Sequence, residues 1–520
     1  MEHFGCRAAR ADGEAIGHQL RAAGLGERQP SAADVVVVNT CSVTAEADRA
    51  ALAFIRRTHR LNAAARIVVT GCFAQRAPEE LAGLEGVSAV VGNSHKGLAP
   101  RIILGLLGRA ALFTDDGLVD VQAATYLERA MSEQLAPPQV AQVVWADGQF
   151  LHSFLEEAQI APGAQTRPNL KIQEGCGNRC TFCVIPSTRG PSRSLPHAAV
   201  LRQVEGFVAA GGNELVLSGI NLGRWGRDFS PSAQKWTAED ACSPSLFSDK
   251  QNADSSTSPR FAQQNGASSL GEPFSFGELS SPAPAPRTLA GLVREIFART
   301  ALPRLRLSSI EPMDWDAELI ALMAEFGGTR LARHAHLPLQ SGSDAVLRRM
   351  HRRYRPWHYT EKVAALMRAA GPALTLGADV MVGFPGETDA EFEETLALLQ
   401  ALPFGYLHLF PFSPRPGTPG WALHAERPVP AEAVEERMKA LRTLAAEKSQ
   451  THRRYFVGRE LEAITLRTPS ELKARGRTAA LTENFLPVEL EGRWEANRRV
   501  RLRVSGLTAD GALEASAVAA

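Results

Sequence analysis

Two groups of three cysteines constrain this chain more than any other feature. One group, Cys176, Cys180 and Cys183, lies within GCGNRCTFC with C-x3-C-x2-C spacing. Three thiolates are one ligand too few for a closed tetrahedral metal site, so a four-iron cluster held there keeps one iron with an open position. A zinc site with a distant histidine as fourth ligand is the alternative, although zinc sites usually use paired C-x2-C knuckles and no second knuckle is present.

The other group, Cys6, Cys41 and Cys72, follows predicted strands. The apolar runs ADVVVVNTC and ARIVVTGC end at Cys41 and Cys72, and a helical pattern lies between them. In a parallel sheet ligands bind beyond the carboxyl ends of the strands, where both cysteines fall. Cys6 occupies the equivalent place, but only five residues precede it, so we expect its strand to be missing or to start upstream. Taken singly, each of the three is more simply a buried core cysteine.

The pattern of apolar runs predicts an α/β protein with about three domains in 520 residues. We expect an N-terminal parallel α/β domain at 1–114 and a linker or insertion at 115–164. About six β/α repeats at 165–441 predict a central partial TIM-type barrel, with polar motifs at its rim. A Ser/Pro-rich stretch at about 229–287, which contains Cys242, is expected to be a disordered insertion. Short strands at 442–520 predict a small β-barrel.

Composition limits the cellular setting. The N-terminus has no apolar signal region, and no stretch approaches the roughly 20 apolar residues of a membrane span, so we expect a cytoplasmic protein without a membrane partner. Clustered cysteines in a reducing compartment more often bind metal than form disulfides. The net charge of +1 gives no argument for nucleic acid by itself.

Several motifs resemble those of a known family. The segment KIQEGCGNRCTFCVIP resembles the signature of radical S-adenosylmethionine (SAM) enzymes. The segments HLPLQSGSDAVLRRMHRRYRP, DVMVGFPGETDAEFEET and LHLFPFSPRPGTP are similar to the methylthiotransferases of that superfamily, and FGCRAARAD, NTCSVTAEAD and VTGCFAQ resemble their first domain. Ala9 and Arg10 depart from this pattern, because the family usually has Asn and Gln after the first cysteine.

The resemblance implies two [4Fe-4S] clusters. Cys176, Cys180 and Cys183 would hold the catalytic cluster, whose open iron binds SAM and whose reductive cleavage yields a 5′-deoxyadenosyl radical. The other cluster, at Cys6, Cys41 and Cys72, would have a free site for exogenous sulfur. An electron donor and a sulfur donor are therefore expected partners. A radical is needed because the target hydrogen is not acidic enough for a side-chain base.

The resemblance also implies contacts to SAM. Glu214 would accept a hydrogen bond from the methionine ammonium, and Gly383 and Gly386 would let the backbone approach the ligand. The full set of expected SAM-side residues is Phe182, Gly211, Gly212, Glu214, Ser308, Gln340, Ser341, Gly383, Pro385 and Gly386. Each could instead be a loop or cap residue without ligand contact.

The C-terminal segment resembles the TRAM domain, a small β-barrel related to OB-type nucleic-acid binders, with TENFLPVEL as its central motif. Basic clusters near the barrel rim and before this module suit a phosphate backbone, although such clusters are as often a solvated helix face. We expect tRNA contacts from Arg352, Arg353, Arg453, Arg454 and Asn484.

The family modifies either adenosine 37 of tRNA or an aspartate of a ribosomal protein. Within it, RLRLSSIEP and FPFSPRPGTP look most like the threonylcarbamoyladenosine branch. The alternatives are isopentenyladenosine 37 and the ribosomal-protein aspartate. A hypothesis of another class is a non-catalytic iron-sulfur protein that binds RNA, which the full C-x3-C-x2-C motif disfavours because a binder has no use for an open iron.

Overall fold

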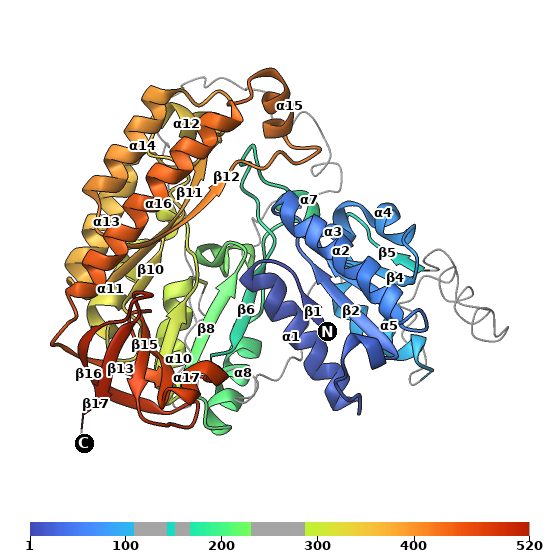
Figure 1. Ribbon diagram of the computed structural model, residues 1–520, viewed down its shortest axis with the longest axis horizontal. Coiled ribbons are helices and arrows are strands. Elements are labelled where there is room, and N and C mark those ends of the chain that lie inside the picture. Colours follow the sequence, from blue (N-terminus) through green and yellow to red (C-terminus); the bar gives the residue numbers. More distant parts are fainter. Residues whose placement is uncertain (109–142, 151–166, 230–286, 519–520) are drawn as a thin grey trace, which may run out of the picture.

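The computed structural model describes residues 1–108, 143–150, 167–229 and 287–518. Figure 1 shows an N-terminal α/β part, a curved central sheet with helices on its outer side, and a small barrel beside the start of several central strands. Cys242 and nearly all of the predicted insertion lie outside the described residues, as does most of the predicted linker. No helix in the described ranges is long and apolar enough to cross a membrane.

The N-terminal part is a parallel five-stranded sheet in the order β1-β2-β3-β4-β5. Its strands are β1 (Glu2–His3), β2 (Val35–Thr40), β3 (Arg66–Gly71), β4 (Val87–Gly92) and β5 (Val143–Trp145). Its helices are α1 (Arg7–Ala22), α2 (Ala45–Leu61), α3 (Cys72–Arg76), α4 (Pro78–Ala82) and α5 (Ala99–Leu106). The Val/Ile runs of β2 and β3 are buried on both faces, as is typical of parallel sheets.

Two details differ from the sequence-based expectation. The first strand is present, as the two-residue β1, which pairs with Val38 and Asn39 of β2. The predicted linker also contributes β5, which pairs with Ala89 to Val91 of β4.

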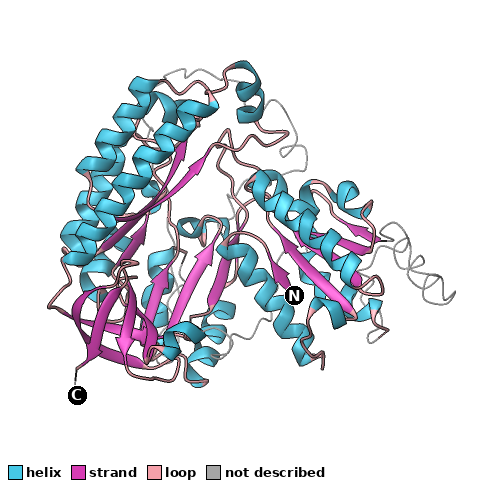
Figure 2. Ribbon diagram, in the orientation of Figure 1, coloured by secondary structure: helices cyan, strands magenta, loops and turns pink. Residues whose placement is uncertain are grey.

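The centre is a half-barrel of six parallel strands, which confirms the predicted partial TIM-type architecture. These strands are β6 (Asn169–Glu174), β8 (Glu214–Gly219), β9 (Arg304–Leu307), β10 (His334–His336), β11 (Thr375–Val382) and β12 (Phe404–Pro411). They form the sheets β7-β6-β8-β9 and β10-β11-β12, where β7 (Arg193–Ser194) is antiparallel to β6. Figure 2 shows both sheets in magenta on the inner side of the helices.

The helices of the half-barrel close one apolar core against the outer face of its strands. They are α8 (His197–Ala209), α10 (Leu289–Arg299), α11 (Ala317–Phe326), α12 (Asp344–Arg349), α13 (Pro356–Ala370), α14 (Asp389–Ala401), α15 (Pro419–Glu426) and α16 (Ala431–Arg454). The short helix α7 (Ile185–Arg189) instead contacts α3 of the N-terminal part. The start of α14 is fixed by a capping box between Thr388 and Glu391.

The C-terminal part is a closed five-stranded barrel, as predicted, in the order β13-β14-β15-β17-β16. Its elements are β13 (Glu460–Thr465), α17 (Ser470–Ala474), β14 (Arg477–Thr482), β15 (Pro487–Glu491), β16 (Arg499–Leu507) and β17 (Leu513–Ala517). Alternate residues of β16, RVRLRVSGL, are buried and exposed, which gives the small barrel an apolar interior and an arginine-rich surface.

Candidate active site

The three N-terminal cysteines converge at the carboxyl edge of their sheet. Cys6 precedes α1, Cys41 follows β2, and Cys72 begins α3 directly after β3. A hydrogen bond from Cys41, together with the charge of Arg189, lowers the pKa of the Cys6 thiol to about 5. The same contact and burial raise the pKa of Cys41, which also feels the charge of Cys72. The three sulfurs therefore form one group.

Two glycines keep the backbone close around these thiols. Gly5 and Gly71 both have positive φ, +111° and +103°. A Cβ on Gly5 would lie 2.6 Å from Cys41 Sγ, and one on Gly71 would lie 2.2 Å from the Thr40 carbonyl oxygen. A side chain on Gly5 would fill the space beside the Cys41 sulfur, and one on Gly71 would collide with the Thr40 backbone, so the chain provides a cradle that fits a cluster with three thiolate ligands.

The half-barrel completes this thiol site. Arg189, the last residue of α7, donates from Nε to Cys72 Sγ at 3.3 Å. Asn93 donates from Nδ2 to the same sulfur at 3.3 Å and to the Thr188 carbonyl at 2.8 Å. Hydrogen bonds from both parts of the molecule thus stabilise negative charge on Cys72 sulfur, the form in which it binds metal.

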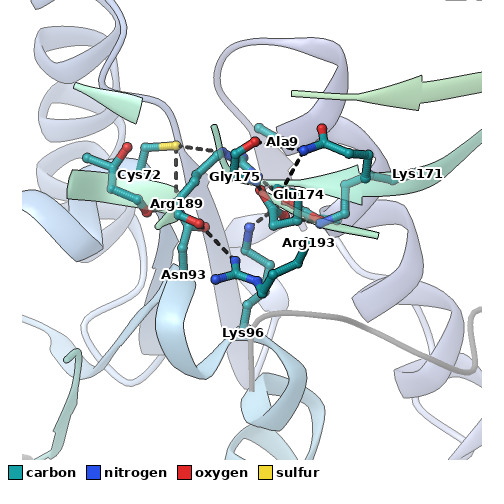
Figure 3. A network of polar contacts seen from close by, with 12 residues as sticks. Ala9, Cys72, Asn93, Lys96, Lys171, Glu174, Gly175, Arg189 and Arg193 are labelled. Atoms are coloured by element: carbon teal, nitrogen blue, oxygen red, sulfur yellow. Dashed lines mark hydrogen bonds and ion pairs between the residues drawn. The ribbon is translucent and has the colours of Figure 1, made fainter. Parts of the chain in front are cut away.

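Arg189 belongs to a buried charge network, shown in Figure 3. Its NH1 lies 2.7 Å from Glu174 Oε1 and 3.2 Å from Asp12 Oδ2. Lys96 binds Asp12 at 2.5 Å, and Lys171 binds both carboxylates. Every member is at most 7% exposed at its side chain.

Three cations therefore surround two carboxylates where helix α1 of the N-terminal part meets β6. Burial alone would raise the pKa of Asp12 and Glu174, but the neighbouring positive charges hold both pKa values below the ordinary range. Asp12 and Lys96 come from the N-terminal part, and the other three come from the half-barrel. The network consequently fixes how the two parts meet beside Cys72.

The barrel cysteines lie in one loop beyond the carboxyl end of β6. Backbone N–H groups of Asn178 and Ile185 approach Cys176 Sγ and Cys183 Sγ at 3.4 Å each. Burial raises the pKa of Cys176 to about 11 and that of Cys183 further. The charge of Cys180 also raises the pKa of both thiols, so the three sulfurs lie near enough to interact electrostatically. Such thiols favour a positive partner, and iron would supply it.

A buried arginine also contacts this second site. Arg352 donates from NH1 to Cys180 Sγ at 3.2 Å and pairs through NH2 with Glu311 Oε2 at 2.5 Å. Its side chain is 4% exposed. Arg352 was expected to contact RNA, and this placement corrects that expectation: the guanidinium points at the cysteine loop.

The two thiol sites are linked by a single short helix. Cys183 lies two residues before α7, and Ile185, the first residue of α7, donates its N–H to Cys183 Sγ. Arg189, its last residue, contacts Cys72. One helical turn and a half therefore connects the ligand loop of one site with a sulfur of the other.

Buried polar atoms without partners mark space for a ligand beside the cysteine loop. Ser308 Oγ, Gln340 Oε1 and Asn221 Oδ1 have no hydrogen-bond partner among the described residues. They follow β9, β10 and β8 respectively, at the same rim as the loop. Gln340 also has a left-handed φ of +65°, a strained conformation that clusters at functional sites. These atoms fit a polar cofactor such as SAM.

Three of the expected SAM contacts, Gly211, Gly212 and Glu214, do not reach the cysteine loop. Gly211, Gly212 and Glu214 lie at or before the start of β8, at the opposite end from the cysteine loop. Glu214 is fully buried and accepts from Arg306 Nε at 2.9 Å. A Cβ on Gly212 would strike the Phe207 ring at 2.2 Å. The residue after β8 that approaches the loop is Asn221, with Nδ2 3.8 Å from Cys176 Sγ.

The FPGE turn is explained by packing. Gly383 has a φ of +73°, and a Cβ there would lie 2.5 Å from Val434 of α16. Pro385 is buried, and Gly386 donates its N–H to the Arg427 carbonyl. Ser341 is fully buried and shares a hydrogen bond with Thr395 of α14. Phe182 is half-buried against the core of the half-barrel.

The predicted RNA contacts separate into two groups. Asn484 is fully buried and donates to the Ala373 carbonyl at 2.9 Å, so it joins the small barrel to the half-barrel and is not available to RNA. Arg453 donates to the Gly511 carbonyl in a similar junction. Arg454 is exposed, and Arg353 is 44% exposed at its side chain.

Sequence patterns did not single out Arg189, Asn93 or Asn221. A usable signal was present for Arg189, which is a charged residue in the otherwise weakly polar VIPSTRG directly after the cysteine loop. Asn93 and Asn221 each follow a strand, where ligand-facing residues gather.

Comparisons with known proteins agree with this architecture. Residues 1–92 match an uncharacterised protein family, UPF0004, and residues 276–399 match the radical SAM superfamily. The threonylcarbamoyladenosine tRNA methylthiotransferase MtaB of Bacillus subtilis is 29% identical, over 94% of this chain and 89% of its own length. MtaB of Aquifex aeolicus is 28% identical, over 97% and 99%.

A third relative is the tRNA-2-methylthio-N(6)-dimethylallyladenosine synthase of Erythrobacter litoralis, which is 31% identical over 90% of this chain and 86% of its own length. The chain belongs to the radical SAM methylthiotransferase family. This methylthiotransferase is therefore a transferase, and the predicted cofactors, SAM and two [4Fe-4S] clusters, are those of its family.

Proposed function

We propose that this methylthiotransferase converts N6-threonylcarbamoyladenosine in tRNA to its 2-methylthio derivative. The observation that carries the proposal is the convergence of Cys6, Cys41 and Cys72 into a second thiol group, joined to the barrel thiols through α7. The relatives named for threonylcarbamoyladenosine match over nearly their full length, which supports the substrate.

Cys176, Cys180 and Cys183 would hold the cluster that binds SAM, and Cys6, Cys41 and Cys72 the auxiliary cluster. When bound, these groups supply the radical and the sulfur that a non-acidic C–H bond requires. The chain's own residues position and insulate them. Arg189 and Asn93 fix Cys72, and Arg352 fixes Cys180 with Glu311 as its counterion. Ser308, Gln340 and Asn221 would offer polar contacts to SAM from the strand ends.

The remaining expectations belong to the same proposal. The exposed side chains of Arg353 and Arg454 would contact the tRNA backbone, and the reaction would draw on a separate electron donor and sulfur donor in the cytoplasm. The working units would be the N-terminal α/β part including β5, the half-barrel, and the small barrel.

Mass spectrometry of tRNA nucleosides from a deletion strain tests the substrate. We expect 2-methylthio-N6-threonylcarbamoyladenosine to disappear and its unmethylthiolated precursor to accumulate. The dimethylallyladenosine synthase relative supports the alternative substrate. Loss of 2-methylthio-N6-dimethylallyladenosine instead would establish that alternative, and loss of neither would direct attention to the ribosomal-protein aspartate.

A further inference from the structure

A group of imidazole and carboxylate side chains lies on the half-barrel away from all six cysteines. His336 on β10, Asp379 on β11 and His408 on β12 each offer one ligand atom, and the three atoms lie within 4.8 Å of one another. Ala335, Ala378 and Leu407, which directly precede these residues on the same three strands, pack into or against the core with the outer helices. Because side chains alternate along a strand, the three polar residues face the inner side of the half-barrel.

Adjacent strands hold this group in place. Asp379 and His408 are direct cross-strand neighbours in the β11–β12 register. His336 Nε2 lies 3.1 Å from Asp379 Oδ1, and His408 Nδ1 lies 3.2 Å from the same oxygen. These separations are close to the ~3.3 Å between ligand atoms that a tetrahedral ion with bonds of about 2.0–2.1 Å requires.

The second ring nitrogen of His336 also has a hydrogen-bond partner. This nitrogen, Nδ1, lies 3.0 Å from the Tyr406 hydroxyl. A Cβ on Gly377 would lie 2.1 Å from the Tyr406 ring, so this glycine leaves the room that the tyrosine occupies. Metal-binding histidines usually have such a partner on the second nitrogen, which orients the ring.

The group is open on one side. The His408 side chain is 59% exposed, whereas that of His336 is 8% exposed. The Asp379 carbonyl accepts a hydrogen bond from the backbone N–H of Gln340 at 2.8 Å. The group therefore lies next to Gln340, one of the residues expected to contact SAM.

We propose that His336, Asp379 and His408 bind one divalent metal ion of the zinc class, whose open positions take oxygen ligands from the N6 substituent of the substrate adenosine. Two imidazoles and a carboxylate are a ligand set with which such ions keep positions for exogenous ligands. The threonylcarbamoyl group carries a carboxylate and a hydroxyl, whereas a dimethylallyl group has no oxygen. The metal would thus select the substrate, a part of the inference that rests on the proposed function.

Metal binding is tested on the anaerobically purified holoprotein. After equilibrium dialysis against micromolar zinc, elemental analysis should find one zinc per chain in addition to the cluster iron. Asp379→Asn and His408→Ala should each weaken zinc binding at least about tenfold, whereas His18→Ala on α1 should retain it. Because the His408 side chain is exposed, we expect its replacement to leave folding intact. Absence of stoichiometric zinc, or equal binding by all variants, overturns the site.

Substrate ligation is tested with anticodon stem-loop RNA. Zinc should tighten binding of a threonylcarbamoyladenosine stem-loop about tenfold, within the usual range of coupling between sites, and leave a dimethylallyladenosine stem-loop unchanged. Equal affinity of the first stem-loop with and without zinc overturns the oxygen-ligand role but leaves the proposed function. If the protein binds zinc but neither stem-loop, the proposed function and the substrate-binding role of the metal are both contradicted. The metal site itself then stands.

Discussion

The two thiol sites are built in opposite ways but have the same kind of neighbour. The barrel thiols come from one loop of eight residues, Cys176 to Cys183, whereas the N-terminal thiols come from three strand ends spread over 67 residues, Cys6 to Cys72. In each site one sulfur accepts from a buried arginine, Arg352 at Cys180 and Arg189 at Cys72. The sulfur environment is therefore a tertiary feature in both.

The two arginines differ in which parts of the molecule supply their carboxylate partners. Arg352 stays within the half-barrel and pairs with Glu311, whose side chain is 19% exposed. Arg189 crosses from the half-barrel to the N-terminal part and pairs with two carboxylates that are at most 1% exposed. The N-terminal site is consequently completed by the neighbouring part of the molecule, and the barrel site is not.

The largest effects should come from the cysteines themselves, because each set is proposed to hold its own cluster. Cys180→Ser should abolish 5′-deoxyadenosine formation, whereas Cys72→Ser should retain it and lose methylthio transfer. Each variant should lose about half of the iron, since four of eight irons sit in each cluster. Iron analysis and product chromatography measure both. Cleavage of SAM by the Cys180 variant would contradict the division.

Arginine replacement should separate the two sites by stability. Arg189→Gln leaves Asp12 and Glu174 with less positive charge in a buried place and should lower the free energy of unfolding by about 3–5 kcal/mol. Arg352→Gln should cost less, about 1–3 kcal/mol, because water reaches Glu311. Urea unfolding of both variants provides the comparison. Equal losses of unfolding free energy in the two variants would mean that the charge network around Arg189 adds no more stability than the pair of Arg352 and Glu311.

Replacing a glycine beside the N-terminal thiols should have the next largest effect. Gly71→Ala places a Cβ against the Thr40 carbonyl in a left-handed backbone and should destabilise the N-terminal site by roughly 1–3 kcal/mol. Gly24→Ala is the matched control, since Gly24 also has positive φ but has nothing within 4 Å of its Cβ position. Thermal unfolding and iron retention should fall more for the Gly71 variant. Equal behaviour would show that backbone strain alone is responsible.

The smallest effect concerns pH. Glu174 has a lowered pKa in the folded protein, so the unfolded chain binds more protons in acid. Its stabilisation is complete above the ordinary pKa of 4.5 and is lost as the pH falls below that value toward the lowered folded pKa. Urea unfolding from neutral pH down to values below 4.5 should show this decline, and Glu174→Gln should flatten it. An unchanged slope in the variant would exclude Glu174 as the source.

Much of the architecture was predictable because it is encoded locally. Apolar runs ending in cysteine predicted the N-terminal parallel sheet, repeated β/α alternation predicted the half-barrel, and short alternating strands predicted the closed C-terminal barrel. Periodicity reports which residues are buried, but it does not report which buried residues meet. For that reason Glu214 was expected to contact SAM, and Arg352 and Asn484 to contact tRNA, whereas their observed partners are Arg306, Cys180 and the Ala373 carbonyl.

The sequence by itself determined the two sets of thiols, because ligand spacing and strand ends are short-range properties of the chain. Only the tertiary structure decided what surrounds them. Arg189 and Cys72 are 117 residues apart and meet because α7 packs against α3 of the N-terminal part. A buried charge needs an oppositely charged partner, and the fold can bring that partner from any part of the chain. Local sequence patterns do not show which distant residue it will be.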